Sequence, residues 1–379
     1  MKIKDICNSV TDGSHNPPHG IEHSDYMMLS SKNIYDDEIT FDEPRYLADG
    51  DFQREHKRTN ISEGDVLLTI VGTVGRTAIV DKNMPIFTLQ RSVAVLHPKQ
   101  ELCLGRFLMY ALRGKRTYIE SRAKGVAQKG IYLGEVSDID LKLPDIVEQE
   151  QIIKILDNVC EIIKLRKLEL RSLDNLTKAR FVEMFDLKEC TYGTFGKNTD
   201  FVDYRGKTPE LSDIGTIRMV NAKSVGKGKF KTVNEYVTEE VYENWMHRGL
   251  GYPGDILFVT EGHTFGNTCL VPDYLKKFAL GQRVITIKGH SGVVDNAFLC
   301  TYMQMGQFIQ DINVYKTGGT AQGIRSKDLM KVGIPLPNYR KQKEFSVFVQ
   351  QVNKSKVAVQ KALDETQTLF DSLMQEYFG

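Results

Sequence analysis

The sequence lacks any long apolar run, and this excludes a protein that crosses a membrane by helices. A membrane-spanning helix needs about 18 consecutive apolar residues, and no such run occurs. The first ten residues, MKIKDICNSV, also lack the apolar core of a secretory signal peptide. We therefore expect a cytoplasmic protein with no membrane partner.

Cysteine and histidine are too scattered to predict a metal centre. No two of the six cysteines are spaced like a Cys-x-x-Cys pair, and the eight histidines include no His-Glu-x-x-His motif. His15, His19 and His23 lie close together in sequence, and we favour a surface loop there over a metal site. In a cytoplasmic protein the cysteines should be reduced thiols.

The chain also has almost no net charge, with 50 Lys and Arg against 49 Asp and Glu. A nucleic-acid partner therefore cannot be inferred from charge alone. The first 146 residues contain 19 basic and 21 acidic residues, whereas residues 188–336 contain 18 basic and 15 acidic residues. Any contact with DNA phosphates would have to come from local clusters. The candidate clusters are Arg113–Arg116 with Arg122, Lys124 and Lys129, and Lys223–Lys231, although either could equally be ordinary solvated surface.

What the sequence has is an internal repeat. GDVLLTI begins at Gly64 and GDILFVT at Gly254, while IDLKLP ends at Pro144 and VGIPLP at Pro337. Three further pairs keep this order at offsets of 191 to 193. MMLSSKNI matches RMVNAKSV, FTLQRSVAVL matches FALGQRVITI, and KGVAQKGI matches TGGTAQGI. Ordered matches at a nearly constant offset predict two copies of one unit.

Each copy begins with short β-like runs separated by turn residues and ends in one long helix without internal Pro or Gly. We predict these helices at about 147–185 and 339–378. The domain boundaries that follow are 1–146, 147–187, 188–336 and 337–379. The fold class is α+β, with two α/β domains separated by two long helices in a pseudo-two-fold repeat.

Both predicted helices carry apolar residues at alternating steps of four and three, the pattern of a helix–helix seam. The apolar seam positions are Ile152, Leu156, Val159, Ile163, Leu170 and Leu173 in the first helix and Phe345, Val349, Val352, Val359, Leu363, Phe370 and Leu373 in the second. A long amphipathic helix needs a partner to bury such a stripe. We favour an antiparallel coiled coil of the two helices, the alternative being that each packs on its own domain.

Motifs of catalysis are missing. NPPH at Asn16–His19 is similar to the NPP-aromatic loop of adenine methyltransferases, but the fourth residue is His19 and no glycine-rich cofactor loop follows a strand at the expected place. GTFGKN at Gly193–Asn198 fails the spacing of a phosphate-binding loop, and no Gly-x-Ser-x-Gly elbow occurs. Two interpretations remain open at this point, namely a methyltransferase-fused enzyme and a coiled-coil scaffold without a nucleic-acid role.

Taken together, these motifs resemble the DNA-specificity (S) subunit of type I restriction–modification systems. The residues that carry the resemblance are the TDGSHNPP loop, the repeated Gly-Asp-(Ile/Val)-Leu run with the Gln-Arg pair after it, and LPDIVEQEQI at Leu143–Ile152 leading into the long helix. The second copy, LPNYRKQKEF, keeps Gln342 but has Lys341 in place of an acidic residue.

The resemblance implies two target recognition domains that each read one half of a bipartite double-stranded DNA sequence, with the helices setting the gap. It implies that two methyltransferase (M) subunits, and possibly restriction (R) subunits, dock on the chain, which is itself not an enzyme. No cofactor is expected in this chain, because the partner methyltransferase binds S-adenosylmethionine and methylates adenine.

Polar loops at matching places in the two copies are the candidate DNA-binding residues, because Arg, Gln, Ser, Thr and His side chains read base edges. In the first copy they are Ser14, His15, Thr73, Arg76, Gln90, Arg91, Gln128 and Lys129. In the second copy they are Tyr204, Arg205, Lys207, His263, Thr264, Gln282, Arg283, Thr320 and Gln322. The alternative for the two Gln-Arg pairs is a structural role, since both copies keep them. Glycines in the same turns would let the backbone approach phosphate.

Overall fold

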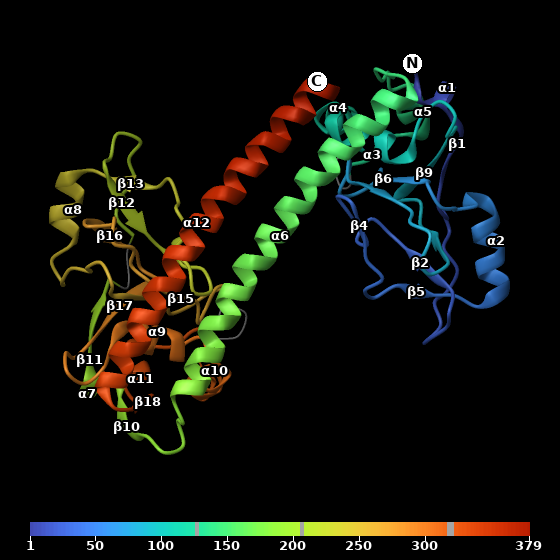
Figure 1. The fold of residues 1–379 in the computed structure, drawn as a ribbon. Helices are drawn as coiled ribbons and strands as arrows, with labels where there is room; N and C mark the ends of the chain where they lie inside the picture. The colour runs from blue at the N-terminus through green and yellow to red at the C-terminus, as the bar shows by residue number, and fades with distance from the viewer. Residues whose placement is uncertain (126–128, 205–207, 317–321) are drawn as a thin grey trace. The chain divides into compact units, whose positions relative to one another are not determined.

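The computed structural model describes residues 1–125, 129–204, 208–316 and 322–379. The chain divides into two compact units. Unit 1 comprises Met1–Arg166 and Ala362–Gly379, and unit 2 comprises Lys167–Lys361. The division cuts both long helices, so that each unit contains one globular head and a part of each helix (Figure 1).

The head of unit 1 is built on two small sheets and the two-stranded pair β3-β4. A four-stranded antiparallel sheet has the order β1-β9-β6-β7, and a three-stranded sheet has the order β5-β2-β8, in which β2 and β8 are parallel. The strands are β1 (Cys7–Asp12), β2 (Met27–Leu29), β3 (Ile34–Tyr35), β4 (Glu38–Ile39), β5 (Arg45–Tyr46), β6 (Val66–Thr69), β7 (Thr77–Ile79), β8 (Phe87–Leu89) and β9 (Val93–Pro98). The helices are α1 (Ile3–Ile6), α2 (Asp49–Thr59), α3 (Gly105–Gly114), α4 (Arg116–Arg122) and α5 (Leu133–Ser137).

The head of unit 2 repeats this plan. Its four-stranded sheet has the order β11-β17-β14-β15, and β13-β12-β16 form a three-stranded sheet in which β12 and β16 are parallel. The strands are β10 (Thr191–Thr194), β11 (Thr199–Asp203), β12 (Ile217–Val220), β13 (Tyr236–Val237), β14 (Ile256–Val259), β15 (Thr268–Leu270), β16 (Phe278–Leu280), β17 (Val284–Gly289) and β18 (Gly333–Leu336). The helices are α7 (Phe195–Asn198), η1 (Ala222–Ser224), α8 (Glu239–Trp245), α9 (Asn296–Tyr302), α10 (Gly306–Asn313) and α11 (Ser326–Leu329).

The repeated sequence motifs occupy equivalent places in the two heads. The first glycine of each Gly-Asp run, Gly64 and Gly254, has φ of +87° and +84°. A positive φ of this size favours glycine, because a Cβ would clash with the backbone. The strand after it, β6 or β14, is buried at all four residues and lies in the middle of its sheet. The internal repeat predicted from the sequence is thus a structural repeat.

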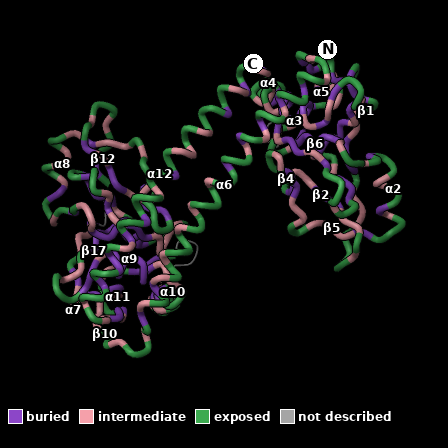
Figure 2. Tube along the Cα trace, viewed as in Figure 1, coloured by how far each residue is buried: buried purple, intermediate pink, exposed green. Residues whose placement is uncertain are grey.

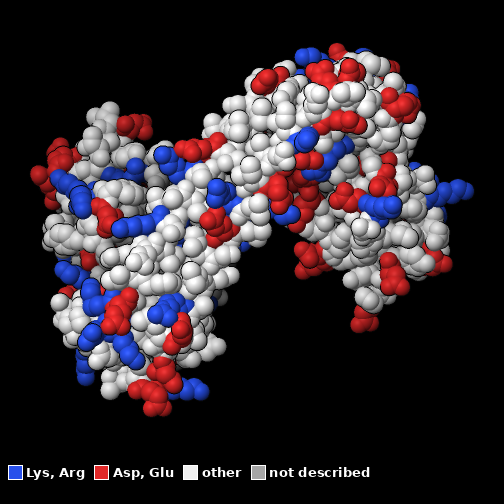
Figure 3. Space-filling model, viewed as in Figure 1, with Lys and Arg blue, Asp and Glu red and all other residues white. Residues whose placement is uncertain are grey.

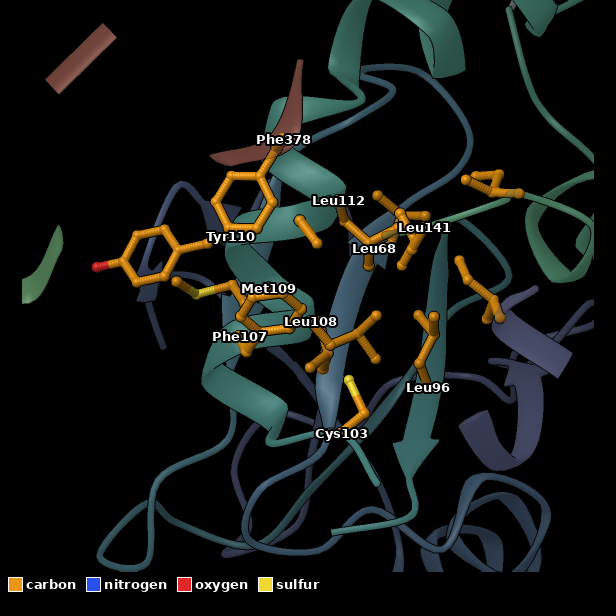
Figure 4. Packing of buried hydrophobic residues seen from close by; sticks show 14 of the residues in the cluster. Leu68, Leu96, Cys103, Phe107, Leu108, Met109, Tyr110, Leu112, Leu141 and Phe378 are labelled. Carbon is orange, nitrogen blue, oxygen red and sulfur yellow. The ribbon is translucent and has the colours of Figure 1, made fainter. Parts of the chain in front are cut away.

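Each head has an apolar core to which the long helices contribute. In unit 1 the core includes most of α3, with Phe107, Leu108 and Tyr110 at most 1% exposed (Figure 4). Phe378, near the end of the second long helix, lies 5.4 Å from Phe107 between ring centroids. Figure 2 shows the buried residues gathered mainly inside each head, whereas the middle parts of both long helices are mostly exposed or half-buried.

The long helices are α6 (Ile146–Met184) and α12 (Tyr339–Phe378), within one residue of the predicted ends. Asp145 and Asn338 cap them, since their side-chain oxygens accept hydrogen bonds from the backbone N–H of Glu148 (2.9 Å) and Arg340 (3.0 Å). A carboxylate or amide at this position satisfies an N–H that has no partner within the helix.

The two helices are antiparallel, as the contacts within unit 2 show by themselves. In unit 1 the first half of α6 shares a core with the end of α12, and in unit 2 the end of α6 shares a core with the start of α12. In unit 2, for example, Phe181 and Phe345 lie 5.5 Å apart between ring centroids, and Lys356 pairs with Asp174 at 2.6 Å. The fold is therefore the α+β arrangement with an antiparallel helix pair that the sequence predicts.

All apolar seam residues predicted from the sequence are buried or half-buried. From residue 164 to residue 180 of α6, only Arg166, Leu170, Leu173, Thr177 and Arg180 are not exposed. That spacing is the one expected of a helix that turns a single face to its partner.

Across the part of the chain that the structure describes, no helix is long and apolar enough to cross a membrane. The six cysteines are unpaired, and four of them are buried.

Candidate nucleic-acid interface

In both heads the glycine turn after the central strand contacts the glycine-rich segment that the sequence also singles out. The N–H of Gly72 donates to the carbonyl of Lys129 at 3.0 Å, and the N–H of Gly262 donates to the carbonyl of Gln322 at 2.9 Å. These bonds bring the turn containing Thr73 next to Lys129, and the turn containing His263 next to Gln322. The predicted loops therefore meet in the same way in both copies.

The Gln-Arg pair of unit 1 lies against the loop that follows β1. The N–H of Ser14 donates to the carbonyl of Leu89 (2.8 Å), and the N–H of Arg91 donates to the carbonyl of Ser14 (2.9 Å). Ser14 is only 4% exposed, so its contribution is through the backbone. Gln90 is half-buried and the Arg91 side chain is exposed.

A buried carboxylate orients two exposed side chains beside this loop. Asp12 is 7% exposed, and its two oxygens lie 2.7 Å from Nε2 of His15 and 2.8 Å from Nη2 of Arg58. His15 and Arg58 are about half exposed, so both present polar atoms to solvent from fixed positions. Sequence reasoning missed Arg58, which lies on α2, because no motif connects this helix to the loop at His15.

The head of unit 2 has a hollow of about 330 Å³ at its glycine turn. It is lined by Gly262, His263, Phe265, Gly266, Ile309, Ile312, Asn313, Lys316 and Gln322. The ammonium of Lys316 lies 5.6 Å from the centroid of the Phe265 ring, which holds a positive charge at the wall of the hollow. The sequence predicted His263 and Gln322 here but missed Asn313 and Lys316.

Other predicted residues have structural partners. Tyr204 is 1% exposed, and its hydroxyl donates to the carbonyl of Gly249 (2.8 Å) and accepts from the N–H of Arg248 (2.6 Å). Burial raises the pKa of Tyr204. A side chain enclosed in this way supports the fold and does not offer an edge to a base, so the prediction for Tyr204 is corrected. Arg283 pairs with Glu261 at 3.0 Å at the surface.

Arg76 and the threonines of the glycine turns also contact their own head. The Arg76 guanidinium lies 4.9 Å from the centroid of the Tyr35 ring, and Nη1 donates to the carbonyl of Ile34 at 3.4 Å. The carbonyl of Thr73 accepts from the Thr69 hydroxyl, and the carbonyl of Thr264 accepts from a backbone N–H at 3.0 Å. Gln282 is half-buried. Four predicted residues lie outside the described residues, namely Gln128, Arg205, Lys207 and Thr320.

Some residues of the basic clusters pair with acidic residues of the same head. Arg113 and Arg116 both face Asp36, and Arg113 is half-buried, with its side chain 13% exposed. Lys124 pairs with Glu135 at 3.6 Å.

In unit 2, Lys223 pairs with Glu235 at 2.6 Å, and the hydrogen bond from Lys223 lowers the pKa of Glu235. Figure 3 shows Lys and Arg side by side with Asp and Glu over the visible face of both units. Arg113 and Arg116 are thus paired within the head, and phosphate binding by this cluster stays a prediction.

A second polar hollow, of about 400 Å³, lies in unit 1 and is lined in part by Arg58, Asp65 and His97. Nδ1 of His97 lies 2.8 Å from Oδ1 of Asp65. The hydrogen bond with Asp65 raises the pKa of His97, although burial opposes it. Among the described residues no cluster of His, Cys, Asp and Glu is arranged to hold a metal ion.

The glutamine of each Leu-Pro motif connects a long helix to its head. Gln149 and Gln342 are fully buried. Oε1 of Gln342 accepts from the N–H of Asp295 (2.8 Å), and its Nε2 donates to the carbonyls of Val293 (3.0 Å) and Pro337 (2.8 Å). This explains physically why both copies keep the glutamine.

Gln149 makes the equivalent contacts in unit 1. It bonds the N–H of Leu104 (2.9 Å) and the carbonyls of Leu102 (2.8 Å) and Pro144 (2.9 Å). In both units one amide side chain therefore satisfies three backbone groups of the head and of the segment that enters the helix.

Comparisons with known proteins agree with this repeat. The family described as "Type I restriction modification DNA specificity domain" matches residues 1–174 and 206–366. The chain is 25% identical over 228 residues to the EcoBI specificity subunit of Escherichia coli, which covers 59% of this chain and 46% of that subunit. It is 24% identical over 324 residues to the MjaVIII specificity subunit of Methanocaldococcus jannaschii, which covers 79% of this chain and 75% of that subunit.

Two solved structures share the fold. The S subunit of a type I restriction–modification system from M. genitalium has a TM-score of 0.60 at 14% identity, over 100% of this chain and 95% of that one. A chain from a study of complex assembly and conformational transition in the type I restriction–modification system has a TM-score of 0.55 at 15% identity, over 100% of this chain and 96% of that one. With the match of the family over most of its length, the chain belongs to the type I restriction–modification DNA specificity family.

Proposed function

We propose that this chain recognises a bipartite double-stranded DNA target and carries adenine methyltransferase subunits to it. The observation that supports this most is the repeated head: two domains of one topology with different side chains at equivalent loops. The glycine turn of one head presents Thr73 where the other presents His263, and the contacting segments present Lys129 and Gln322. Two different surfaces on one framework suit two different half-sites.

Contact with DNA would come from local features and not from a uniformly basic surface. His15 and Arg58, oriented by Asp12, are exposed donors in unit 1. In unit 2 the hollow combines Lys316, which can meet a phosphate, with amide and imidazole groups that can meet a base edge. Binding that depends on few phosphate contacts should be weak for this chain alone.

We further propose that the chain is not itself an enzyme and works in the cytoplasm. S-adenosylmethionine would be bound by two methyltransferase subunits, and restriction subunits could join the same assembly. In the loop that is similar to a methyltransferase motif, the carbonyl of Pro18 accepts a hydrogen bond from Nη1 of Arg45 at 2.8 Å. This carbonyl is therefore engaged within the head, which favours a structural role for the loop over recognition of a flipped adenine.

The proposal is tested by co-expressing the chain with the methyltransferase encoded beside it and mapping modified adenines across the host genome by long-read sequencing. We expect one motif with two defined halves separated by a gap of fixed length. A Lys316→Ala variant should lower modification without changing the half-site that unit 1 reads. Modification without preference for a bipartite motif would refute the function, and binding of S-adenosylmethionine by the isolated chain would favour the fused-enzyme alternative.

A further inference from the structure

A chain of charged groups connects a tight turn of unit 1 to the long helix α6. Asp36 and Asp37 form the turn between β3 and β4. Arg106, on α3, donates from Nη1 and Nη2 to the two oxygens of Asp37 at 2.8 and 2.9 Å, and from Nε to Oδ1 of Asp157 on α6 at 2.7 Å. One guanidinium therefore joins the turn, the core helix of the head and α6. A planar guanidinium that pairs with a carboxylate through two bonds fixes orientation as well as distance.

Tyr110 adds a second bond to the same carboxylate. Its ring lies in the core of unit 1, and Figure 4 shows its hydroxyl pointing out of the labelled cluster. That hydroxyl donates to Oδ1 of Asp157 at 2.6 Å. Burial, together with the hydrogen bond to Asp157, raises the pKa of Tyr110, so the hydroxyl keeps the proton that it donates. Burial opposes the charge on Arg106, but its bonds to Asp37 and Asp157 raise its pKa and keep it cationic.

The other carboxylate of the turn is held in the same way. Arg116 pairs with Asp36 and donates from Nε to the carbonyl of Gly75 at 3.0 Å. The Arg113 guanidinium lies 5.6 Å from the Tyr110 ring centroid and 3.9 Å from Asp36. Burial opposes the charge on Asp36, but the bond from Arg116 and the charges of both arginines lower its pKa. Asp36 and Asp37, which make up one two-residue turn, thus both pair with arginines of the same head.

Unit 2 has no such connection among its described residues. The backbone bond from Asp37 to Thr77 recurs as a bond from Gly228 to Thr268, which aligns the two turns. The residues of unit 2 that match Asp36, Asp37, Arg106, Tyr110 and Asp157 are Lys227, Gly228, Ala297, Thr301 and Gln350. None of these could form the ion pairs of unit 1.

Unit 2 shares its aromatic packing with unit 1, since Phe185 and Phe298 occupy the places of Phe378 and Phe107. Phe185 lies 4.7 Å from Phe298 and 5.6 Å from Phe345 between ring centroids. Phe185 directly follows α6, Phe298 lies on α9 and Phe345 lies near the start of α12. Both heads therefore contact their helices through an apolar core and a buried glutamine. The bridge through Arg106 is found in unit 1, whereas unit 2 has an ion pair between Lys343 and Asp295 at 3.2 Å.

We propose that Arg106 and Asp157 are positioning residues that fix the orientation of the unit 1 head on α6 and so restrict the spacing between the two DNA half-sites. The inference rests on the proposed function, because spacing matters only to a chain that reads two half-sites. In unit 1 the bridge through Arg106 adds polar bonds with a required geometry to the apolar contacts and the buried glutamine that both heads share. Loosening the ion pairs should therefore widen the accepted spacing without abolishing recognition.

The first test needs no assumption about function. Asp157→Asn removes the charge but keeps the size, and Gln350→Glu is the matched control at the equivalent exposed position of α12. In the full chain, amide hydrogen exchange at the β3–β4 turn, Ile34–Ile39, should accelerate about tenfold in Asp157→Asn and stay unchanged in the control. Unchanged exchange in both variants would overturn the proposed connection even if the chain proves to be a specificity subunit.

The second test measures spacing in the complex with the methyltransferase. Duplexes carrying the mapped target, and the same target with one base pair added to or removed from the gap, are methylated by wild type and variants. A displacement of about 1 Å can change a rate up to a hundredfold, so we expect Asp157→Asn to reduce the preference for the correct gap about tenfold. Tyr110→Phe, which keeps the core ring, should act in the same direction but less.

The outcomes separate the two proposals. The positioning role would be refuted if Asp157→Asn preferred the correct gap as strongly as wild type does. It would also be refuted if Asp157→Asn and Gln350→Glu lost this preference equally. A wild-type complex that ignores the gap altogether would instead refute the proposed function. Thermal unfolding of each variant before assay checks that a change in preference does not come from a loss of folded protein.

Discussion

The buried glutamines at the start of the long helices give the sharpest test of the fold. Gln342→Ala removes the side-chain oxygen that accepts from the N–H of Asp295 and the NH2 group that donates to the carbonyls of Val293 and Pro337. The side chain is fully buried, so water cannot replace these bonds without opening the junction. The change should therefore affect stability and not only a local contact.

The size of the effect can be derived from these three contacts. A buried polar group left without a partner costs about 1–3 kcal/mol, and such costs are not fully additive. Three backbone groups left without a hydrogen-bond partner therefore predict a loss of roughly 3–6 kcal/mol in the free energy of unfolding. For a unit of this size, 1 kcal/mol corresponds to about 2–4 °C in the midpoint of thermal unfolding. The expected shift is thus roughly 6–24 °C, at the transition of unit 2.

The assay is urea unfolding of the full chain followed by circular dichroism, with Gln149→Ala as the counterpart in unit 1. Gln151→Ala is the control, because Gln151 lies on the same turn of α6 but is exposed. The control should stay within about 0.5 kcal/mol of wild type. If Gln342→Ala and Gln149→Ala unfold at the same urea concentration as the control, the glutamines do not hold the helices to the heads and the reasoning is wrong.

Three further predictions concern charge and DNA. The hydrogen bond with Asp65 raises the pKa of His97, so protonated His97 stabilises the folded state fully below its unfolded pKa of about 6.5. This contribution should be lost as the pH rises through the higher folded pKa. His97→Gln should therefore remove this pH dependence of the unfolding free energy, measured by urea unfolding between pH 6 and 9. Lys316→Ala should weaken DNA binding by the methyltransferase complex and reduce the slope of log K against log salt by about 1, and an unchanged slope would contradict a phosphate contact. Asp12→Asn should weaken the same binding several-fold by releasing Arg58, measured by fluorescence anisotropy, whereas equal affinity would show that this carboxylate orients nothing that contacts DNA.

Much of the fold could be predicted from the sequence because its signals are periodic. The steps of four and three from Ile152 onward and from Phe345 onward depend only on helix geometry, and the structure buries or half-buries those positions. The internal repeat allowed us to match elements of the two copies, because both copies keep their turn glycines. By contrast, α2 was not expected, since it is mostly charged and buries only Phe52 and Thr59.

The candidate site was less predictable, because it depends on which side chains meet. Tyr204 looks like a polar loop residue in sequence, but Trp245, 5.6 Å away between ring centroids, helps to enclose it. Arg113 and Arg116 look like a basic cluster until Asp36, some 80 residues away along the chain, is found beside them. Lys316 carries no motif and becomes a candidate only through the hollow that it lines. Ion pairing and burial between distant segments leave no local trace in a sequence.

The C-terminal end of α12 belongs to the same compact unit as the first 166 residues, with the whole of unit 2 between them in the chain. On the ribosome, head 1 emerges long before the segment that contributes Phe370, Met374 and Phe378 to its core. Unit 2 has all its parts once Lys361 has emerged, so its completion needs no later segment. Folding of unit 1 should consequently be the slower event, limited by a contact of very long sequence separation. Until that contact forms, the apolar surface around Phe107 stays open to chaperones and to aggregation.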